Sequence, residues 1–384
     1  MSRLNKLYVV DAWKYRGDLL DVDLSAPKES VVISLPGRFD LIGGWTDTPP
    51  QSREMPAAVL HSSLTYCQSL ESLITIVIRP SGQFVYIANG EINEDWPEIT
   101  KQVFAFLEIT PPPVKIFVNN LIPRGSGLGG SSLLISGILA AILAYYKGIK
   151  YLEDSKTIGR IIRYTLYVEQ MIGTGGGWQD QIGGLIPGLK LTETLPECPD
   201  TYRVKIVNSE TTQLLQERCL LVDTEITRPA AAILHSLRDK YVAGDQKVID
   251  LLSAIGQNAL RGWDLLGKRD FNNFAQLMDE SWQKVCAIES GSTIPVIDNL
   301  RRSLGNIIAG LKIGGAGGGG FILIILENEN HRSRALSQIK QVLPGAKIYT
   351  PNFGCPGLVV KYEEPRTAIF SAINGQSINI CHED

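Results

Sequence analysis

The feature that most constrains this sequence is a glycine-rich turn, PRGSGLGGSSLL at residues 123–134. The residues before it, VKIFVNN at 114–120, alternate between apolar and polar as a strand does, and the residues after it predict a helix over 131–147. Glycine adopts positive φ without strain, and backbone N–H groups at the start of a helix attract anions. The turn therefore predicts a strand, an anion site and a buried helix in that order, although the lysine of an ordinary P-loop is missing.

The turn alone permits three interpretations. Gly125 to Gly130 fits the G-x-G-x-x-G fingerprint of dinucleotide-binding folds, and Glu153 and Asp154 follow about 20 residues later, near where a ribose-binding acid would stand. In a second interpretation the glycines only permit a tight turn at the start of a helix. In a third, the turn holds phosphates for transfer and a serine hydroxyl reaches a metal ion. The rest of the chain must separate them.

The composition restricts the class of protein. A chain of 384 residues is long for one hydrophobic core and favours two or three domains. The net charge of −3 argues against a nucleic-acid binder, and the six scattered cysteines form no C-x-x-C pair, which suits reduced thiols. The longest apolar run, Leu133–Tyr146, is shorter than a membrane span, and the N-terminus lacks a signal-peptide core. We expect a cytoplasmic monomer or homodimer without nucleic-acid or membrane partners.

Strands and helices are predicted in both halves of the chain, which indicates an α+β fold. In the first half, VVISLPGRFDLI at 31–42 begins as a strand and turns at Pro36-Gly37, and SLITIVIRPSGQFVYIA at 72–88 predicts a β-hairpin around Arg-Pro-Ser-Gly. TETLPECPDTY at 192–202 carries prolines and acids without periodicity. This segment predicts a domain boundary, with an N-terminal domain over 1–200 and a C-terminal domain over 201–384.

The second half has a simpler pattern. Residues 229–267 and 271–310 predict helices, and KIGGAGGGGFILIILEN at 312–328 predicts a glycine loop that leads into a core strand. No internal repeat or low-complexity segment interrupts the pattern. A second glycine cluster at this distance from the first is not required by a dinucleotide site.

Phosphate transfer requires a magnesium ligand, a group that orients or deprotonates the acceptor, and a cation that balances the developing charge. Arg38 in PGRFD, Glu169 in YTLYVEQ and Asp180 in GGWQDQ are residues of these types. Each has a simpler explanation when taken singly. Arg38 fits a surface ion pair, Glu169 a solvated helix residue and Asp180 a helix N-cap. Only their combination with the glycine segments favours phosphate transfer over these structural explanations.

Three segments, in this order, resemble the motifs of the GHMP kinase superfamily. PGRFDLIGGWTD at 36–47 resembles the first motif in its galactokinase form, PRGSGLGGSS at 123–132 the ATP-phosphate loop, and KIGGAGGGGF at 312–321 the third motif. Three motifs at these distances are far more specific than one, and they favour phosphate transfer over the dinucleotide interpretation. The resemblance implies a two-domain fold, with an N-terminal domain like ribosomal protein S5 domain 2, a ferredoxin-like C-terminal domain and a site in the cleft between them.

Narrower segments are similar to the kinase domain of L-fucokinases. They are GGWTDTPP at 43–50, GTGGGWQDQIGG at 173–184, and Trp282 followed by ESGSTIPVID at 289–298. Heptose-7-phosphate kinases, with GGGTD and QDQ motifs, are the nearest alternative, and Trp45 and Trp178 favour the fucokinases. The similarity implies a kinase that uses ATP and Mg²⁺ to phosphorylate the anomeric hydroxyl of a free sugar. A sugar sensor without activity would have lost the catalytic residues, which are all present.

The resemblance also implies roles for single residues. Asp180 matches the catalytic aspartate and Arg38 the arginine beside it. Ser131 and Glu169 match the magnesium ligands, although Gly130 replaces the first serine of the usual motif and leaves Ser132 as the alternative ligand. An adjacent cation favours an ionised carboxylate, so whether Asp180 acts as a base or only orients the acceptor stays open.

Three sets of binding residues follow from the same resemblance. The ATP-phosphate loop comprises Pro123, Gly125, Ser126, Gly127, Leu128, Gly129, Gly130, Ser131 and Ser132. The acceptor site comprises Gly44, Trp45, Asp47, Gln179 and Asp180. The C-terminal glycine loop comprises Gly315, Ala316, Gly317, Gly318 and Gly319. Trp45 or Trp178 would stack on an apolar sugar face, such as one bearing a deoxy methyl group, or would fill a core between domains.

Overall fold

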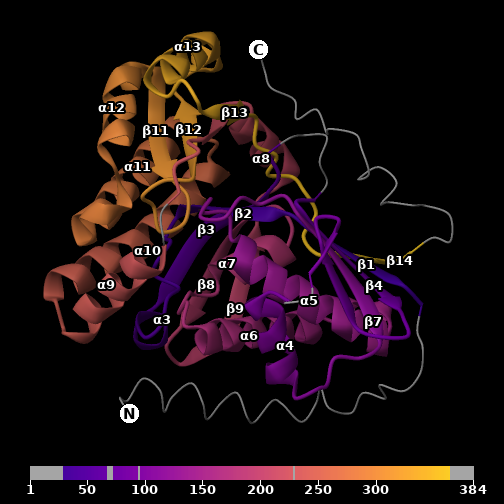
Figure 1. The fold of residues 1–384 in the computed structure, drawn as a ribbon. Helices are drawn as coiled ribbons and strands as arrows, with labels where there is room; N and C mark the ends of the chain where they lie inside the picture. Colours follow the sequence, from indigo (N-terminus) through magenta and orange to yellow (C-terminus); the bar gives the residue numbers. More distant parts are fainter. Residues whose placement is uncertain (1–28, 67–71, 94–95, 228–229, 364–384) are drawn as a thin grey trace.

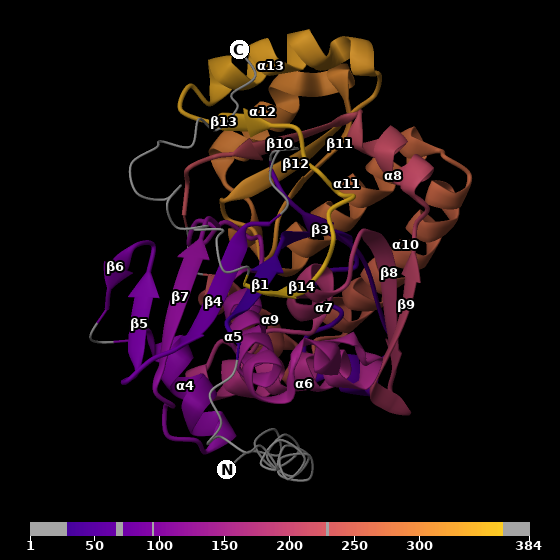
Figure 2. The same cartoon turned by 90° about the vertical axis from the view of Figure 1, so that its right-hand side faces the viewer.

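The computed structural model describes residues 29–66, 72–93, 96–227 and 230–363. Within them the chain forms one six-stranded and two four-stranded sheets, together with helices in both halves (Figure 1). This arrangement confirms the predicted α+β class. In Figure 2 the C-terminal sheet and helices α12 and α13 lie above the two N-terminal sheets, and α4 and α6 lie below them.

The six-stranded sheet has the order β14-β1-β4-β7-β5-β6. Its strands are β14 Val359–Tyr362, β1 Val31–Leu35, β4 Ile74–Pro80, β7 Val114–Asn120, β5 Val85–Ala88 and β6 Glu91–Ile92. β14 pairs antiparallel with β1, so the described end of the chain returns to the N-terminal sheet.

The predicted hairpin over 72–88 is wrong. β4 and β5 form the expected strands, but β7 lies between them, antiparallel to β4 and parallel to β5. β7 buries alternate apolar side chains and offers two hydrogen-bonding edges, which β4 and β5 occupy one each. A turn signal shows where two strands end, but it does not decide which strand lies beside which.

The second N-terminal sheet has the order β2-β3-β8-β9. Its strands are β2 Gly37–Ile42, β3 Ala57–Leu64, β8 Leu189–Leu195 and β9 Cys198–Ile206. The segment 192–202, predicted as a boundary, belongs to the β8–β9 hairpin, in which the two strands pair antiparallel. The predicted division at residue 200 therefore falls inside β9.

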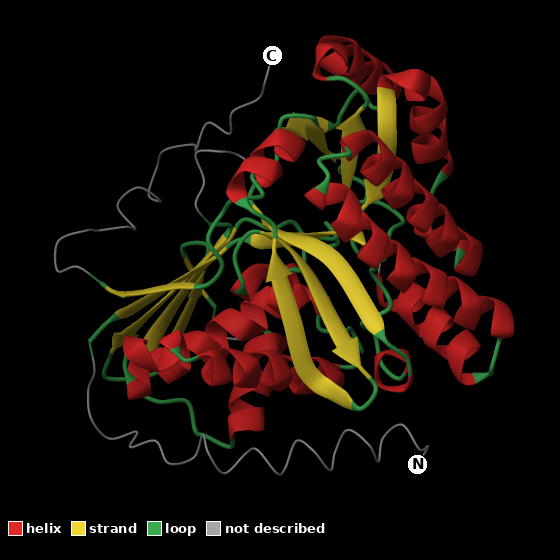
Figure 3. Cartoon of the chain, turned by 180° about the vertical axis from the view of Figure 1, so that it is seen from behind, coloured by secondary structure: helices red, strands yellow, loops and turns green. Residues whose placement is uncertain are grey.

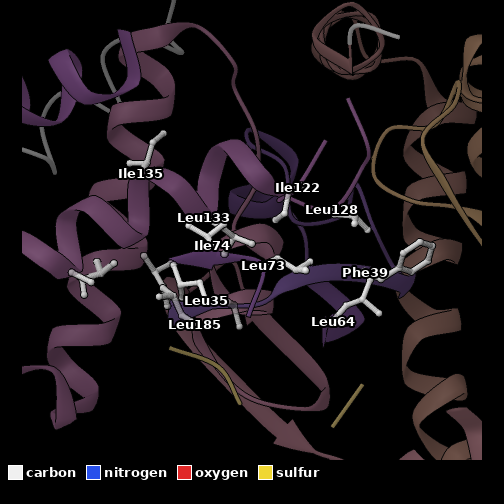
Figure 4. Packing of buried hydrophobic residues seen from close by; sticks show 14 of the residues in the cluster. Leu35, Phe39, Leu64, Leu73, Ile74, Ile122, Leu128, Leu133, Ile135 and Leu185 are labelled. Carbon is white, nitrogen blue, oxygen red and sulfur yellow. The ribbon is translucent and has the colours of Figure 1, made fainter. Parts of the chain in front are cut away.

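Helices pack on both N-terminal sheets (Figure 3). They are α3 Gln51–Glu54, α4 Glu98–Leu107, α5 Gly130–Lys147, α6 Ser155–Ile172 and α7 Gln179–Leu185. α5 contacts β1 and β4, whereas α7 contacts β2 and β3. Figure 4 shows Leu35, Ile74, Leu133 and Leu185 packed together, which joins β1, β4, α5 and α7 in one core.

The helix α5 is the one described helix long and apolar enough to span a membrane by length and composition. Of its 18-residue window, 83% is buried inside the fold, as the sequence predicts for a core helix.

The C-terminal half contains the sheet β11-β12-β10-β13. Its strands are β11 Ile308–Ile313, β12 Phe321–Leu326, β10 Cys219–Asp223 and β13 Lys347–Tyr349, and its helices are α8 Ser209–Gln216, α9 Ala230–Val242, α10 Gln246–Gly267, α11 Phe271–Ile288, α12 Pro295–Leu304 and α13 Arg332–Val342. Each of the two helices predicted over 229–267 and 271–310 is a pair of helices. Gly244, at φ +76°, and the N-cap Asp245 separate α9 from α10.

The two halves meet where α10 crosses the β2–β3 hairpin. A side chain at Gly262 of α10 would come within 2.8 Å of Leu60 and 2.9 Å of Ile42. The bare backbone of α10 thus allows the C-terminal helices to pack directly on the sheet that carries the first glycine motif.

Candidate active site

The structure brings the three glycine segments together. A Cβ at Gly127 would lie 2.4 Å from the carbonyl oxygen of Gly314, so the second and third segments touch through their backbones. Arg38 of the first segment donates its backbone N–H to the carbonyl oxygen of Leu128 at 3.1 Å. The N–H of Phe321, the last residue of the third segment, donates to the carbonyl oxygen of Ser126 at 3.0 Å. Segments nearly 300 residues apart in sequence therefore line one place.

The second segment has the geometry of an anion site. Gly125, Gly127 and Gly129 have φ of +70°, +75° and +75°, values that side chains other than glycine rarely adopt. The segment ends at the first residue of the 18-residue α5, whose N-terminal N–H groups attract negative charge. A Cβ at Gly130 would meet Ile122 at 2.9 Å. The loop therefore fits the phosphates of a nucleotide through its backbone rather than through a lysine.

Arg38 and Asp180 form the ion pair at the centre of the site. The Arg38 guanidinium is buried, and its Nε donates to Asp180 Oδ1 at 2.6 Å. A second nitrogen, Nη2, lies 2.5 Å from the same oxygen, and Nη1 donates to the carbonyl oxygen of Gly127. Asp180 lies in the first turn of α7 and its side chain is 22% exposed. The arginine thus fixes Asp180 against the glycine segment and leaves Oδ2 free of the guanidinium.

Of the two candidate hydroxyl ligands, Ser131 and Ser132, only one lies beside Glu169. Ser132, rather than Ser131, donates its Oγ–H to Glu169 Oε1, and the same hydroxyl lies 3.3 Å from Asp180 Oδ2. Ser131 is exposed. Consecutive helix residues point about 100° apart, so only one of two adjacent serines can face α6 and α7. The predicted metal set Ser131 and Glu169 is therefore not brought together, and Ser132 takes the place beside Glu169.

These oxygens fit a magnesium ion. Burial, with the nearby Asp180 as a second cause, raises the pKa of Glu169 to about 8. Gln181 Nε2 donates to the other Glu169 oxygen at 2.9 Å. Mg²⁺ prefers oxygen ligands, takes one or two carboxylates and completes its shell with phosphates and water. No described group of three His, Cys, Asp or Glu residues could hold a metal by itself.

Asp47 and Gln179 form a second polar cluster beside this pair. The backbone N–H of Gln179 donates to Asp47 Oδ2 at 2.9 Å, and His61 Nδ1 lies 3.1 Å from the carbonyl oxygen of Gln179. Among the described residues, neither Asp47 Oδ1 nor Gln179 Oε1 has a hydrogen-bond partner, although both are buried. A Cβ at Gly44 would lie 3.3 Å from that Gln179 oxygen. These unpaired acceptors suit the hydroxyl groups of a polar ligand.

Burial raises the pKa of Asp47 to about 7, and this shift makes a testable prediction. A carboxyl group with a raised folded-state pKa stabilises the fold fully below its ordinary pKa of 3.8, and that contribution is lost as the pH rises towards 7. We expect the free energy of unfolding of the wild type, relative to Asp47→Asn, to fall by roughly 1.4 kcal/mol per pH unit across this window. Urea unfolding of both proteins between pH 4 and 8 measures the difference, and a constant difference would contradict the prediction.

The two tryptophans predicted as stacking surfaces lie in different cavities. Trp45 is 2% exposed and borders a small cavity between the two halves. Trp178 is 3% exposed and borders another small cavity, with Arg53, Arg163 and Tyr202. Both indoles also pack in apolar cores. The two indole rings therefore cannot stack on the same face of a bound sugar.

A buried ion pair that no sequence pattern indicated lies beneath the site. Lys312, which begins the third glycine segment, donates to Asp40 Oδ2 and to the carbonyl oxygen of Asp40. Asp40 Oδ1 accepts the N–H of Gly315 at 3.0 Å and lies 3.6 Å from Arg38 Nη1. Burial lowers the pKa of Lys312, although Asp40 acts in the opposite direction. Both residues lie within quoted motifs, but only their distance in space identifies the pair.

The remaining predicted residues of the third segment, from Gly315 to Gly319, form its turn. Gly315 and Gly317 to Gly319 all have positive φ, and the N–H of Gly318 donates to the carbonyl oxygen of Ser292 at 2.7 Å. Pro123 begins the second segment, where its carbonyl oxygen accepts the N–H of Ser126 at 3.2 Å.

Family models match both halves of the chain. The model for the N-terminal domain of GHMP kinases matches residues 98–186, and that for their C-terminal part matches residues 264–345. The bifunctional fucokinase/GDP-fucose pyrophosphorylase of Arabidopsis thaliana is 31% identical over 322 residues, which cover 77% of this chain and 30% of that protein. The L-fucokinase/L-fucose-1-P guanylyltransferase of Bacteroides fragilis is 26% identical, covering 80% and 35%. This chain thus spans about a third of the length of these two relatives.

A third relative has a similar length to this chain. The D-glycero-alpha-D-manno-heptose 7-phosphate kinase of Campylobacter jejuni is 26% identical, covering 76% of this chain and 88% of that protein. Among solved structures, Lactococcus lactis galactokinase complexed with galactose superposes with a TM-score of 0.66 at 16% identity, covering 91% of this chain and 99% of that one. A D-glycero-D-manno-heptose 1-phosphate kinase from Bacteroides thetaiotaomicron gives the same TM-score at 19% identity, covering 87% and 99%. These likenesses confirm the predicted two-domain fold.

Proposed function

This chain belongs to the GHMP kinases, and we propose that it phosphorylates the anomeric hydroxyl of a free sugar, with L-fucose or a related sugar as acceptor. The observation that carries the proposal is the convergence of four side chains at the start of α5. Asp180 contacts Arg38 at 2.6 Å, and Ser132 joins it to Glu169. The similarity to the two fucokinases supports the choice of acceptor.

When bound, ATP would supply the phosphoryl group and Mg²⁺ would neutralise charge on its oxygens. The backbone N–H groups of 125–131 and the start of α5 would hold the phosphates, and Ser132 and Glu169 would hold the metal. These groups, with Arg38, would balance the negative charge of the phosphates, which a lysine does in an ordinary P-loop.

Asp180 would receive the hydrogen bond of the acceptor hydroxyl. Arg38 occupies its Oδ1 with two nitrogens and leaves Oδ2 as the acceptor. A carboxylate held in this way would contribute mainly by orienting the hydroxyl towards the phosphate, as a loose transition state permits. The unpaired oxygens of Asp47 and Gln179 would bind further sugar hydroxyls.

The proposal is tested by ADP release from Mg·ATP with L-fucose, D-arabinose, D-galactose, D-mannose and sedoheptulose 7-phosphate as acceptors. We expect turnover on L-fucose, and ³¹P NMR of the product should show an anomeric phosphate. Absence of turnover on every free sugar would overturn the proposal.

A heptose 7-phosphate is the second candidate acceptor. The Campylobacter relative supports it. Turnover restricted to the phosphorylated sugar in the same assay would favour this candidate.

The position of Ser132 makes a prediction about magnesium. We expect Ser132→Ala to raise the Mg²⁺ concentration for half-maximal activity by about 10–100-fold, because the variant loses the hydroxyl beside Glu169. Ser131→Ala is the matched variant, one residue away on the exposed side of α5, and should change this value less than threefold. Magnesium titrations of both variants at saturating ATP measure the effect. A larger effect of Ser131→Ala would restore the first assignment.

A further inference from the structure

The cavity beside Trp45 lies where the two halves of the chain meet. It has room for about one group of the size of a water molecule or a methyl group, and its walls include Trp45 and Gly44 from the first motif, Ile255 of α10, and Trp282 and Val285 of α11. Gly44 joins this cavity to the acceptor site, because a Cβ there would lie 2.2 Å from Asp40 Oδ2 and 3.3 Å from Gln179 Oε1. The cavity thus borders the site in which Asp180 would hold the acceptor hydroxyl.

Trp45 has a strained backbone. Its φ is +78°, a left-handed value that is unusual for a bulky side chain. The loop around it is tied by hydrogen bonds: Thr46 Oγ1 donates to the carbonyl oxygen of Gly43 at 2.7 Å, and the N–H of Thr48 donates to that of Trp45 at 3.3 Å. Such strain persists where the surroundings hold it, and it concentrates at functional sites. The fold therefore holds the Trp45 indole against this cavity despite the conformational free energy that its positive φ costs.

The Trp45 indole also carries an unused donor. Its Nε1–H is buried and has no hydrogen-bond partner among the described residues. A buried donor of this kind is costly unless a ligand or water accepts its hydrogen bond. The other polar groups of the wall are occupied: Ser281 donates to the carbonyl oxygen of Leu277 at 2.8 Å and accepts from Asn258 at 2.9 Å.

The charge of the wall is also balanced. Lys312 is the cation that lines this cavity, and its ammonium group is bound to Asp40. A phosphate or carboxylate entering here would have to compete with a buried carboxylate for that cation. The walls of Ile255, Trp282 and Val285 suit an apolar group instead.

We propose that this cavity is the specificity pocket for the acceptor, in which an apolar substituent such as a deoxy-sugar methyl group lies between Trp45 and Trp282. The Nε1–H of Trp45 donates to an oxygen of the sugar beside that substituent. This inference rests on the proposed function, and it assigns Ile255, Trp282 and Val285 to substrate selection.

The first test removes the donor but keeps the ring. We expect Trp45→Phe to raise the KM for L-fucose about 10-fold, with the KM for ATP and the melting temperature nearly unchanged, because a buried hydrogen bond to the substrate is lost. Trp178→Phe is the matched control, since its Nε1 is equally buried and unpaired but borders the other cavity. Equal KM values for wild type and Trp45→Phe, or a larger effect of Trp178→Phe, would overturn the proposal.

The second test varies the sugar at one carbon. D-Arabinose, L-fucose and L-galactose share their ring hydroxyls and carry hydrogen, methyl and hydroxymethyl at the position concerned. We expect kcat/KM for L-fucose to exceed both others by about 10-fold or more, because a methyl group fills the cavity and a hydroxyl finds no partner. Val285→Leu, which adds a methylene to the wall, should reduce the preference for L-fucose over D-arabinose. Equal kcat/KM for the three sugars would contradict the pocket.

Direct binding separates this inference from the proposed function. L-Fucose binding to the full chain is measured by calorimetry without ATP. Binding weakened by Trp45→Phe but without turnover would support the pocket and overturn the kinase proposal. Turnover on L-fucose that Trp45→Phe leaves unchanged would support the kinase proposal and overturn the pocket. Absence of both binding and turnover would overturn the pocket and the kinase proposal together.

Discussion

Asp180→Asn is expected to lower kcat by about 10²–10⁴-fold, the range typical of removing a group that orients or accepts a proton. The variant keeps the shape of the side chain, but it removes the charge that Arg38 Nε and Nη2 hold at 2.5–2.6 Å. The amide can also turn its NH₂ towards the acceptor, where a hydrogen-bond acceptor is needed. Initial rates at saturating ATP and sugar measure the effect, and ATP binding by calorimetry should be retained because the proposed phosphate site is the 125–131 backbone rather than Asp180.

The control for this variant is Asp250→Asn, a change of the same chemistry on the exposed face of α10. It should leave kcat within twofold of the wild type. If Asp180→Asn retained more than a tenth of the wild-type kcat, with its fold intact, Asp180 would have neither of the assigned roles.

Lys312→Met is expected to lower the free energy of unfolding by about 3–5 kcal/mol, because it leaves the Asp40 carboxylate buried without its main counter-charge. Both side chains are almost inaccessible, at 4% and 1% exposure, so water cannot replace the lost partner. Urea unfolding followed by circular dichroism measures the change. Combining Lys312→Met with Asp40→Asn should recover a large part of the loss, because the unpaired charge is then removed as well.

An exposed pair provides the comparison. Lys347→Met breaks the contact of Lys347 with Glu225, which is 2.6 Å long and nearly half exposed on both sides, and should change stability little. A double variant no more stable than Lys312→Met alone would show that the lysine acts through packing rather than charge.

Several features of the site could be predicted because they depend on local backbone requirements. The glycines of 123–132 and 312–321 occupy positions that need positive φ or a bare backbone, and such positions are visible in one chain segment. The buried α5 followed from its continuous apolar sequence. Arg38, Glu169 and Asp180 were identified by their position in motifs, and the structure brings them together.

Other features could not be predicted because they depend on what lies beside a segment in space. The turn after β4 resembled a hairpin, yet β7 pairs with both strands and separates them. Ser131 and Ser132 have the same chemistry, and only the rotation of α5 against α6 places Ser132 beside Glu169.

The sequence by itself determined the order of elements, the three glycine segments and the residue types that a kinase of this family needs. The tertiary structure alone decided that Asp40 meets Lys312 across 272 residues, that Trp45 and Trp178 border separate cavities, and that Ile255, Trp282 and Val285 face the first motif. The physical reason is that backbone preference acts over a few residues, whereas a pocket between two halves depends on how α10 and α11 pack against β2, β3 and β11.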